Sequence, residues 1–257
     1  MQPSSDLPTD LVPFIERTGY ICRSFLFGLF FIVEDTARDP SYIENHLLSY
    51  TAQDFLQSAV SLPLLIQQGI HNVCRRELRF ILEMSIKLCF IQQQQYESNV
   101  TSKLESFKST LDSSSISVKN HISLEMIPPG ERNTFLQDVG RLYGETSNYV
   151  HLTTTQILER IKLVNQGYTS GKESPTEVEA LNSVIARGLA CSLVFLLHSV
   201  PSYVAGDLLV NEDGSTPNWF FAESKYIALI DEYFDYKHER QSNLENIKAL
   251  RQKRVSF

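Results

Sequence analysis

Hydrophobic spacing is the feature that most constrains the fold of this chain. Apolar residues recur every three or four positions along nearly all of its 257 residues, and no stretch alternates apolar and polar side chains with a period of two. The first period matches one face of a helix, and the second matches one face of a strand. We therefore expect an all-α fold, an antiparallel helical bundle.

The clearest helix is expected from His71 to about Gln95. One stripe of this helix is made of small or apolar side chains, which are Cys74, Leu78, Ile81, Leu82, Ser85, Leu88 and Cys89. A second stripe is charged and spaced four residues apart, and it consists of Arg75, Arg79, Glu83 and Lys87. The sequence thus predicts one core-facing stripe and one stripe of paired charges.

Other helix boundaries follow from proline and capping residues. A first helix is expected over 10–37, and Pro63 predicts a kink in the helical stretch 41–68. Ser174 has a proline after it and Glu177 three residues on, which predicts the N-terminus of a further helix. That helix is apolar nearly all round over 189–197 and is expected to lie at the centre of the core.

We expect residues 1–257 to form a single helical domain with two distinctive segments. Residues 97–130 hold many serines and few large apolar side chains, so we expect a mobile connection that contains one short helix capped by Ser102. Residues 237–257 form a basic C-terminal helix or tail. The span 237–254 has a net charge of +4, whereas the whole chain has a net charge of −7. Such a tail could contact phosphate, dock on its own domain, bind a protein partner, or simply be a solvated helix.

Composition indicates a cytoplasmic protein without metal or cofactor. The four cysteines lie far apart among apolar residues, with neither a C-x-x-C pair nor a histidine at ligand spacing. The longest apolar runs, 25–33 and 189–197, are shorter than the roughly 18 residues that cross a bilayer. Residues 1–10 contain no Lys or Arg, unlike a secretory signal. No membrane association is expected.

The segment from Arg141 to His151 is the strongest candidate for chemistry. If it is helical, Tyr143, Ser147 and His151 share one face at spacings of four. The candidate site combines His151, Arg141, Arg79 and Glu83 as catalytic residues with Tyr143, Ser147 and Tyr149 as substrate-binding residues. In this hypothesis His151 is a base and an arginine binds an anion. The alternative is a buried polar network that fixes how two helices pack.

The same segments resemble a pattern in uncharacterised bacterial helical proteins. The pattern is an Arg-x-x-x-Glu helix, here Arg79 and Glu83, followed by Leu-Tyr-x-x-x-Ser-x-x-x-His, here residues 142–151. Those proteins are similar to the HEPN superfamily, and the resemblance covers roughly residues 40–160. It implies a HEPN-like bundle with additional C-terminal helices. It also implies a homodimer and a role in antiviral defence, toxin–antitoxin or stress-response systems, acting on RNA or a nucleotide.

Catalytic HEPN proteins are metal-independent ribonucleases that place an Arg four to six residues before a His. Here Arg141 and His151 are separated by nine residues, which puts them about 80° apart on an ideal helix. The arrangement departs from the family pattern, so whether the chain is an enzyme stays open. The alternatives are a non-catalytic protein-interaction module, such as a defence-system subunit or an antitoxin-like partner, and a small-molecule sensor with a cavity between helices.

Overall fold

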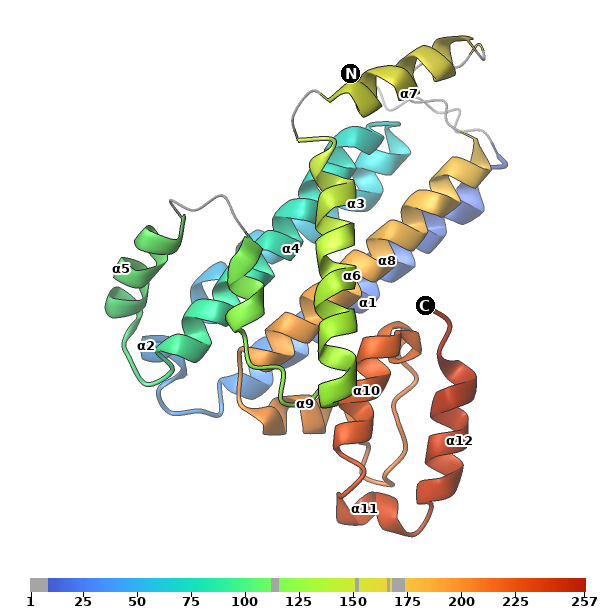
Figure 1. Cartoon of the computed structure of the whole chain (residues 1–257). Helices are drawn as coiled ribbons and strands as arrows, with labels where there is room; N and C mark the ends of the chain where they lie inside the picture. Colours follow the sequence, from blue (N-terminus) through green and yellow to red (C-terminus); the bar gives the residue numbers. More distant parts are fainter. Residues whose placement is uncertain (1–8, 112–115, 151–152, 166, 168–173) are drawn as a thin grey trace.

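The computed structural model describes residues 9–111, 116–150, 153–165, 167 and 174–257. Within these ranges every regular element is a helix and there is no strand (Figure 1). The expectation of an all-α fold is confirmed, because period-three and period-four spacing of apolar residues leaves only helices with a face to bury. The HEPN-like bundle stays a prediction.

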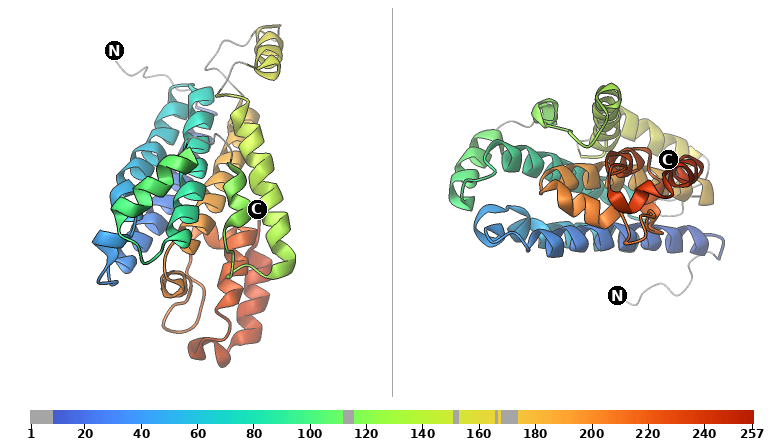
Figure 2. Two further views of the ribbon diagram at one scale, coloured as in Figure 1. Left: turned by 60° about the vertical axis from the view of Figure 1, so that its left-hand side comes forward. Right: turned by 90° about the horizontal axis from the view of Figure 1, so that it is seen from below.

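Four long helices build the core. Their bounds are α1 (Val12–Thr36), α3 (Leu48–Gln67), α4 (His71–Gln94) and α8 (Pro175–His198). α1 and α4 each pack along both α3 and α8, and the four run side by side in Figures 1 and 2. Residues 189–197 of α8 are all buried, so α8 is the central helix that the sequence predicted. The predicted apolar stripe of α4 is buried as well.

The remaining elements surround this core. They are α2 (Tyr42–Asn45), α5 (Val100–Leu111), η1 (Ile116–His121), α6 (Pro129–Ser147), α7 (Thr154–Asn165), α9 (Ser202–Leu209), η2 (Phe220–Glu223), α10 (Lys225–Tyr233), α11 (His238–Gln241) and α12 (Leu244–Arg254). α6 packs on α4 and α8, whereas α9 packs on α1 and α8. α10, α11 and α12 form a compact C-terminal group beside one end of the bundle (Figure 1).

Two local signals in the sequence bear on helix boundaries, a capping box at Ser174 and a proline at position 63. The Ser174 hydroxyl accepts from the Glu177 N–H, and the Glu177 carboxylate accepts from the Ser174 N–H at 2.8 Å, so the predicted capping box is confirmed. The stretch 41–68 forms two helices, α2 and α3, separated at His46 and Leu47, and α3 continues through Pro63, where the kink stays a prediction. Pro63 has no N–H to donate to the Ala59 carbonyl one turn earlier, and the helix continues past this missing bond.

The serine-rich stretch 97–130 holds α5 and η1, and η1 packs on α4. The cap of α5 is Asn99, whose side-chain oxygen accepts from the Ser102 N–H at 3.0 Å, so the prediction of Ser102 as the cap was wrong. Lys103 is fully buried, and its ammonium donates to the carbonyl oxygens of Asn45 and Tyr96. These bonds tie α5 to the end of the bundle.

α8 is the one described helix that is long and apolar enough to span a bilayer. The apolar run 189–197 is too short by itself, but α8 meets the criterion when hydropathy is averaged over 18 residues. In this structure 83% of that window is buried inside the protein, as in the core helix of a bundle. Its apolar surface is therefore already covered by α1, α4 and their neighbours.

Candidate functional site

Packing of α6 on α4 brings together side chains that are sixty or more residues apart in sequence. The Arg79 Nη2 donates to the Tyr143 hydroxyl at 2.7 Å, and the Arg79 guanidinium lies 4.6 Å from the centroid of that ring. The Tyr143 hydroxyl donates to the Glu83 carboxylate at 3.3 Å. Three of the predicted site residues therefore form one hydrogen-bonded cluster, which we call the α4–α6 cluster.

Lys87 joins this cluster one turn further along α4. Its ammonium is buried and donates to Glu83 Oε1 at 2.7 Å, while Glu83 Oε2 lies 3.7 Å from Arg79 Nη2. One carboxylate thus faces two cations, and the cluster keeps a net positive charge. The sequence pattern had already paired these residues at spacings of four, but it did not assign Lys87 to the site.

Arg79 is incompletely satisfied. Its side chain is 15% exposed, and its Nε and Nη1 atoms are buried without a hydrogen-bond partner among the described residues. A buried N–H group without an acceptor costs about 1–3 kcal/mol, so such groups in a folded protein call for an explanation. These two buried nitrogens carry three N–H groups, which could donate to an anion that enters the cluster.

Tyr149 lies just beyond the end of α6 and is held by two arginines that the sequence analysis left out of the site. The guanidinium of Arg75 lies 4.5 Å from the centroid of the Tyr149 ring, and Arg76 donates to the Tyr149 carbonyl. The Tyr149 hydroxyl donates to the Glu159 carboxylate of α7. Burial raises the pKa of this hydroxyl, so it stays protonated as a donor. Arg75 precedes Arg79 by four residues, a spacing that signals their shared face.

The remaining predicted site residues are Ser147 and Arg141, which do not join the α4–α6 cluster, and His151. The Ser147 hydroxyl donates to the Tyr143 carbonyl at 2.6 Å, a bond within α6 itself. Arg141 does not join Arg79, because residues two apart on a helix point about 200° apart and Tyr143 occupies the side of α6 that faces α4. His151 lies outside the described residues.

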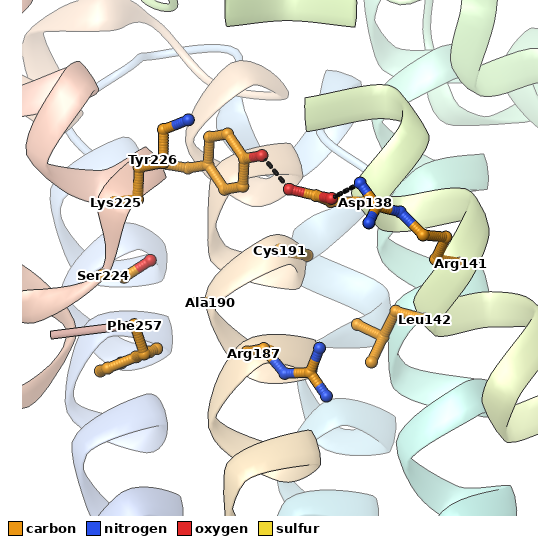
Figure 3. Close-up of a pocket in the computed structure, with 10 residues that line it drawn as sticks. All are labelled: Asp138, Arg141, Leu142, Arg187, Ala190, Cys191, Ser224, Lys225, Tyr226 and Phe257. Atoms are coloured by element: carbon orange, nitrogen blue, oxygen red, sulfur yellow. Dashed lines mark hydrogen bonds and ion pairs between the residues drawn. The ribbon is translucent and has the colours of Figure 1, made fainter. Parts of the chain in front are cut away.

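Arg141 instead lines a separate cavity of about 190 Å³ between α6, α8 and the C-terminal group (Figure 3). There it pairs with Asp138 at 2.5 Å, and Asp138 also accepts from the Tyr226 hydroxyl. The sequence does not predict which side of α6 packs on α4. It therefore could not show that Tyr143 faces α4 while Arg141 faces the cavity. The grouping of Arg141 with Arg79 and Glu83 was thus wrong as a description of position.

A second polar network, at the other end of α4, was not predicted. The buried His46 ring lies 3.0 Å from Asp39 Oδ2 through Nε2 and 3.3 Å from the Gln92 amide through Nδ1. The Tyr96 hydroxyl lies within 3.3 Å of both Asp39 and His46. Hydrogen bonds from His46 and Ser41 lower the pKa of Asp39, while burial lowers that of His46. The His46 ring is buried, and the network links the turns on either side of α2 to the C-terminal end of α4.

The basic segment 237–257 is partly neutralised inside the protein. Arg240 and Arg251 are buried and form ion pairs with Asp231 and Asp235 at 2.5–3.1 Å. Of the alternatives for this segment, docking on its own domain is the one that these contacts favour. We call these four residues the C-terminal charge network.

Comparisons with models of protein families, with curated proteins and with solved structures each return no match. The class of this protein is therefore the one that its fold defines, an all-α protein with a polar cluster between α4 and α6.

Proposed function

We propose that this protein is a HEPN-like defence or stress-response protein that binds phosphate groups of RNA or of a nucleotide at the α4–α6 cluster. The observation that carries the proposal is the state of Arg79. Its Nε and Nη1 atoms have no acceptor among the described residues, and its Nη2 is already oriented by Tyr143. Nε and Nη1 do not share one edge of the guanidinium plane, so each N–H would donate to a phosphate oxygen separately.

The surroundings of Arg79 support the same chemistry. Lys87 and Arg75 add positive charge along the same face of α4. The Glu83 carboxylate lies between Arg79 and Lys87 and reduces the repulsion between these two cations. The Tyr143 hydroxyl is a donor that can turn from Glu83 to a ligand. The segment with His151 follows directly after α6, and the HEPN-like resemblance implies that His151 then serves as the base of a metal-independent ribonuclease.

The test is binding and cleavage of a mixed pool of transfer and messenger RNA by the full-length protein in EDTA. Arg79→Lys keeps the charge but removes the planar fork, and it is expected to weaken RNA binding about tenfold. Tyr143→Phe removes only the hydroxyl. Arg17→Lys is the matched control, because Arg17 is 55% exposed and lies in a surface ion pair with Glu179.

His151→Ala separates binding from catalysis. Cleavage by wild type that His151→Ala abolishes, with RNA binding kept, supports a ribonuclease. Binding without cleavage in either protein supports a non-catalytic RNA or nucleotide protein. If wild type does not bind RNA, and Arg79→Lys changes only thermal stability, the cluster is a packing network and the proposal fails. The homodimer that the resemblance implies is tested separately by analytical ultracentrifugation.

A second candidate function, a protein-interaction module, is favoured by α7. In Figure 1 and in the left view of Figure 2, α7 stands beyond the end of the bundle, and no described helix packs along it. Four of its apolar side chains are exposed, namely Ile157, Leu158, Ile161 and Val164. They cover one face of the helix, with the exposed Arg160 and Lys162 on its two edges.

This face fits a protein partner that presents an apolar patch with an acidic rim. Ile161→Asp places a charge in the centre of the face and is expected to release such a partner without lowering thermal stability. Glu159→Gln, on the opposite side of α7, is the control. A partner that co-purifies equally with Ile161→Asp and wild type would exclude α7 as its docking helix.

A further inference from the structure

The cavity between α6, α8 and α10 is lined by three cations and one carboxylate. The cations are Arg141, Arg187 and Lys225, and the carboxylate is Asp138. Asp138 already accepts hydrogen bonds from both Arg141 and Tyr226, and Figure 3 shows it between these two side chains. Outside the lining, Lys225 pairs with Glu131 at 2.8 Å, and Arg187 lies 3.7 Å from Glu145, so Arg187 is the lining cation with the weakest ion pair.

Arg187 is the cation that is most loosely held. It lies 51% exposed, its Nη2 is 3.7 Å from Glu145, and its Nε donates to the Ser183 carbonyl at 3.4 Å. Both distances are long for bonds that a guanidinium makes with its full strength. In Figure 3 the guanidinium points into the space between α8 and α6. It is free to turn toward an anion in the cavity.

The rest of the lining is apolar. Leu142 of α6 and Ala190 and Cys191 of α8 contribute apolar surface, and the Phe257 ring lies on the side of the C-terminal group (Figure 3). Phe257 is itself fixed, because its ring stacks on Phe220 with centroids 5.1 Å apart and its carbonyl accepts from the Lys225 N–H at 2.6 Å. Burial raises the pKa of the Cys191 thiol to about 12, so this thiol contributes surface and no nucleophile.

The N-terminus of α10 adds a further positive end. Ser224 occupies the cap position and lines the cavity, yet it makes no side-chain capping bond. The first N–H groups of a helix carry partial positive charge and favour an anion nearby. Charge from side chains and from the helix therefore converges on a cavity whose walls are apolar.

We propose that this cavity binds a compact amphipathic anion, a single apolar ring that carries one carboxylate or phosphate group. The ring would lie between Phe257 and Leu142, and the anion would bind Arg187 and Arg141. The size agrees, because the cavity has about 190 Å³ and a cavity of about 150 Å³ accommodates one benzene ring. This site is distinct from the α4–α6 cluster, and it gives Arg141 a role there.

The experiment is isothermal titration calorimetry of the full-length protein with benzoate and with phenyl phosphate. Inorganic phosphate tests the anion alone, and benzyl alcohol tests the ring alone. At least one aromatic anion is expected to bind at least tenfold more tightly than both of these controls. The aromatic anion that binds better distinguishes a carboxylate ligand from a phosphate ligand.

Variants connect the binding to the cavity. Arg187→Gln and Phe257→Ala are each expected to weaken the better ligand about tenfold, whereas the surface control Arg17→Gln is not. Arg79→Lys is expected to leave this binding unchanged, which separates it from the proposed RNA function. The proposal is overturned if neither aromatic anion binds at up to about 10 mM, since that limit excludes even weak association. It is also overturned if binding is unaffected by Arg187→Gln, or if inorganic phosphate or benzyl alcohol binds equally well.

Discussion

Replacing Asp231 by asparagine tests whether the C-terminal charge network holds α10 to α12 together. Asp231 is 1% exposed and accepts from Arg240 Nη2 and Arg251 Nε, both at 2.5 Å, and from the Thr216 hydroxyl at 3.0 Å. Asparagine has almost the same shape but no charge. Two buried guanidinium groups would then share the single carboxylate of Asp235.

Breaking a buried ion pair by removing one partner costs about 3–5 kcal/mol. Asp235 still faces both arginines, at 3.1 Å from Arg240 and 2.6 Å from Arg251, so we expect the lower end of that range, about 3 kcal/mol. For a protein of this size that loss lowers the melting temperature by about 6–12 °C. The free energy of unfolding is measured by urea denaturation, with hydrogen exchange to localise the loss.

Glu245→Gln is the matched control, because Glu245 is 88% exposed and pairs with Lys248 on the surface of α12. Its effect should stay below about 0.5 kcal/mol. In hydrogen exchange, Asp231→Asn should release the amides of α10 to α12 and leave those of α4 and α8 protected. A variant as stable as Glu245→Gln would refute the argument that this network stabilises the C-terminal group.

Three further predictions concern the core. His198 is neutral, with Nδ1 donating to the Val194 carbonyl and Nε2 accepting from the Met126 N–H, and burial lowers its pKa to about 4. Between pH 6.5 and 4, His198 binds a proton in the unfolded chain but not in the folded chain. The free energy of unfolding should therefore fall by up to about 3 kcal/mol as pH falls through this range. His198→Gln should flatten this pH dependence in urea titrations. Gly28→Ala would place a methyl group 2.7 Å from the Trp219 ring and should destabilise by about 1–3 kcal/mol in thermal melts, whereas Gly144→Ala, with open space around it, should not. All four thiols are buried with raised pKa, so they should react with a disulfide reagent only after denaturation, and fast labelling of the native protein would contradict their burial.

Local patterns in the sequence predicted the helices well, because each depends on neighbours within one or two turns. The stripe of α4, the capping box at Ser174 and the burial of α8 all follow from spacing or from a short motif. The cap at Asn99 was missed because Asn99 and Ser102 are both good capping residues, and the choice between them depends on where the helix docks.

The candidate site could be predicted only in part. Arg79, Glu83 and Tyr143 met as the pattern suggested, since each motif presents them on one face of its helix. The position of Arg141 depends on which side of α6 faces α4. The sequence between the two motifs does not predict how α6 is rotated about its own axis. The network of His46 and Asp39 joins residues by tertiary packing alone, so no local spacing predicts it.

The central position of α8 also sets the order in which the protein can acquire its structure. α1 and α4 bury their apolar faces against α8, which the ribosome synthesises only after two thirds of the chain. Until then α1 has only α3 to cover its apolar stripe, and α4 lacks the partner of the face that it turns to α8. A nascent chain of this kind is prone to aggregation. The bundle is thus completed late in synthesis, and a fragment that ends before Pro175 would lack the helix around which the others assemble.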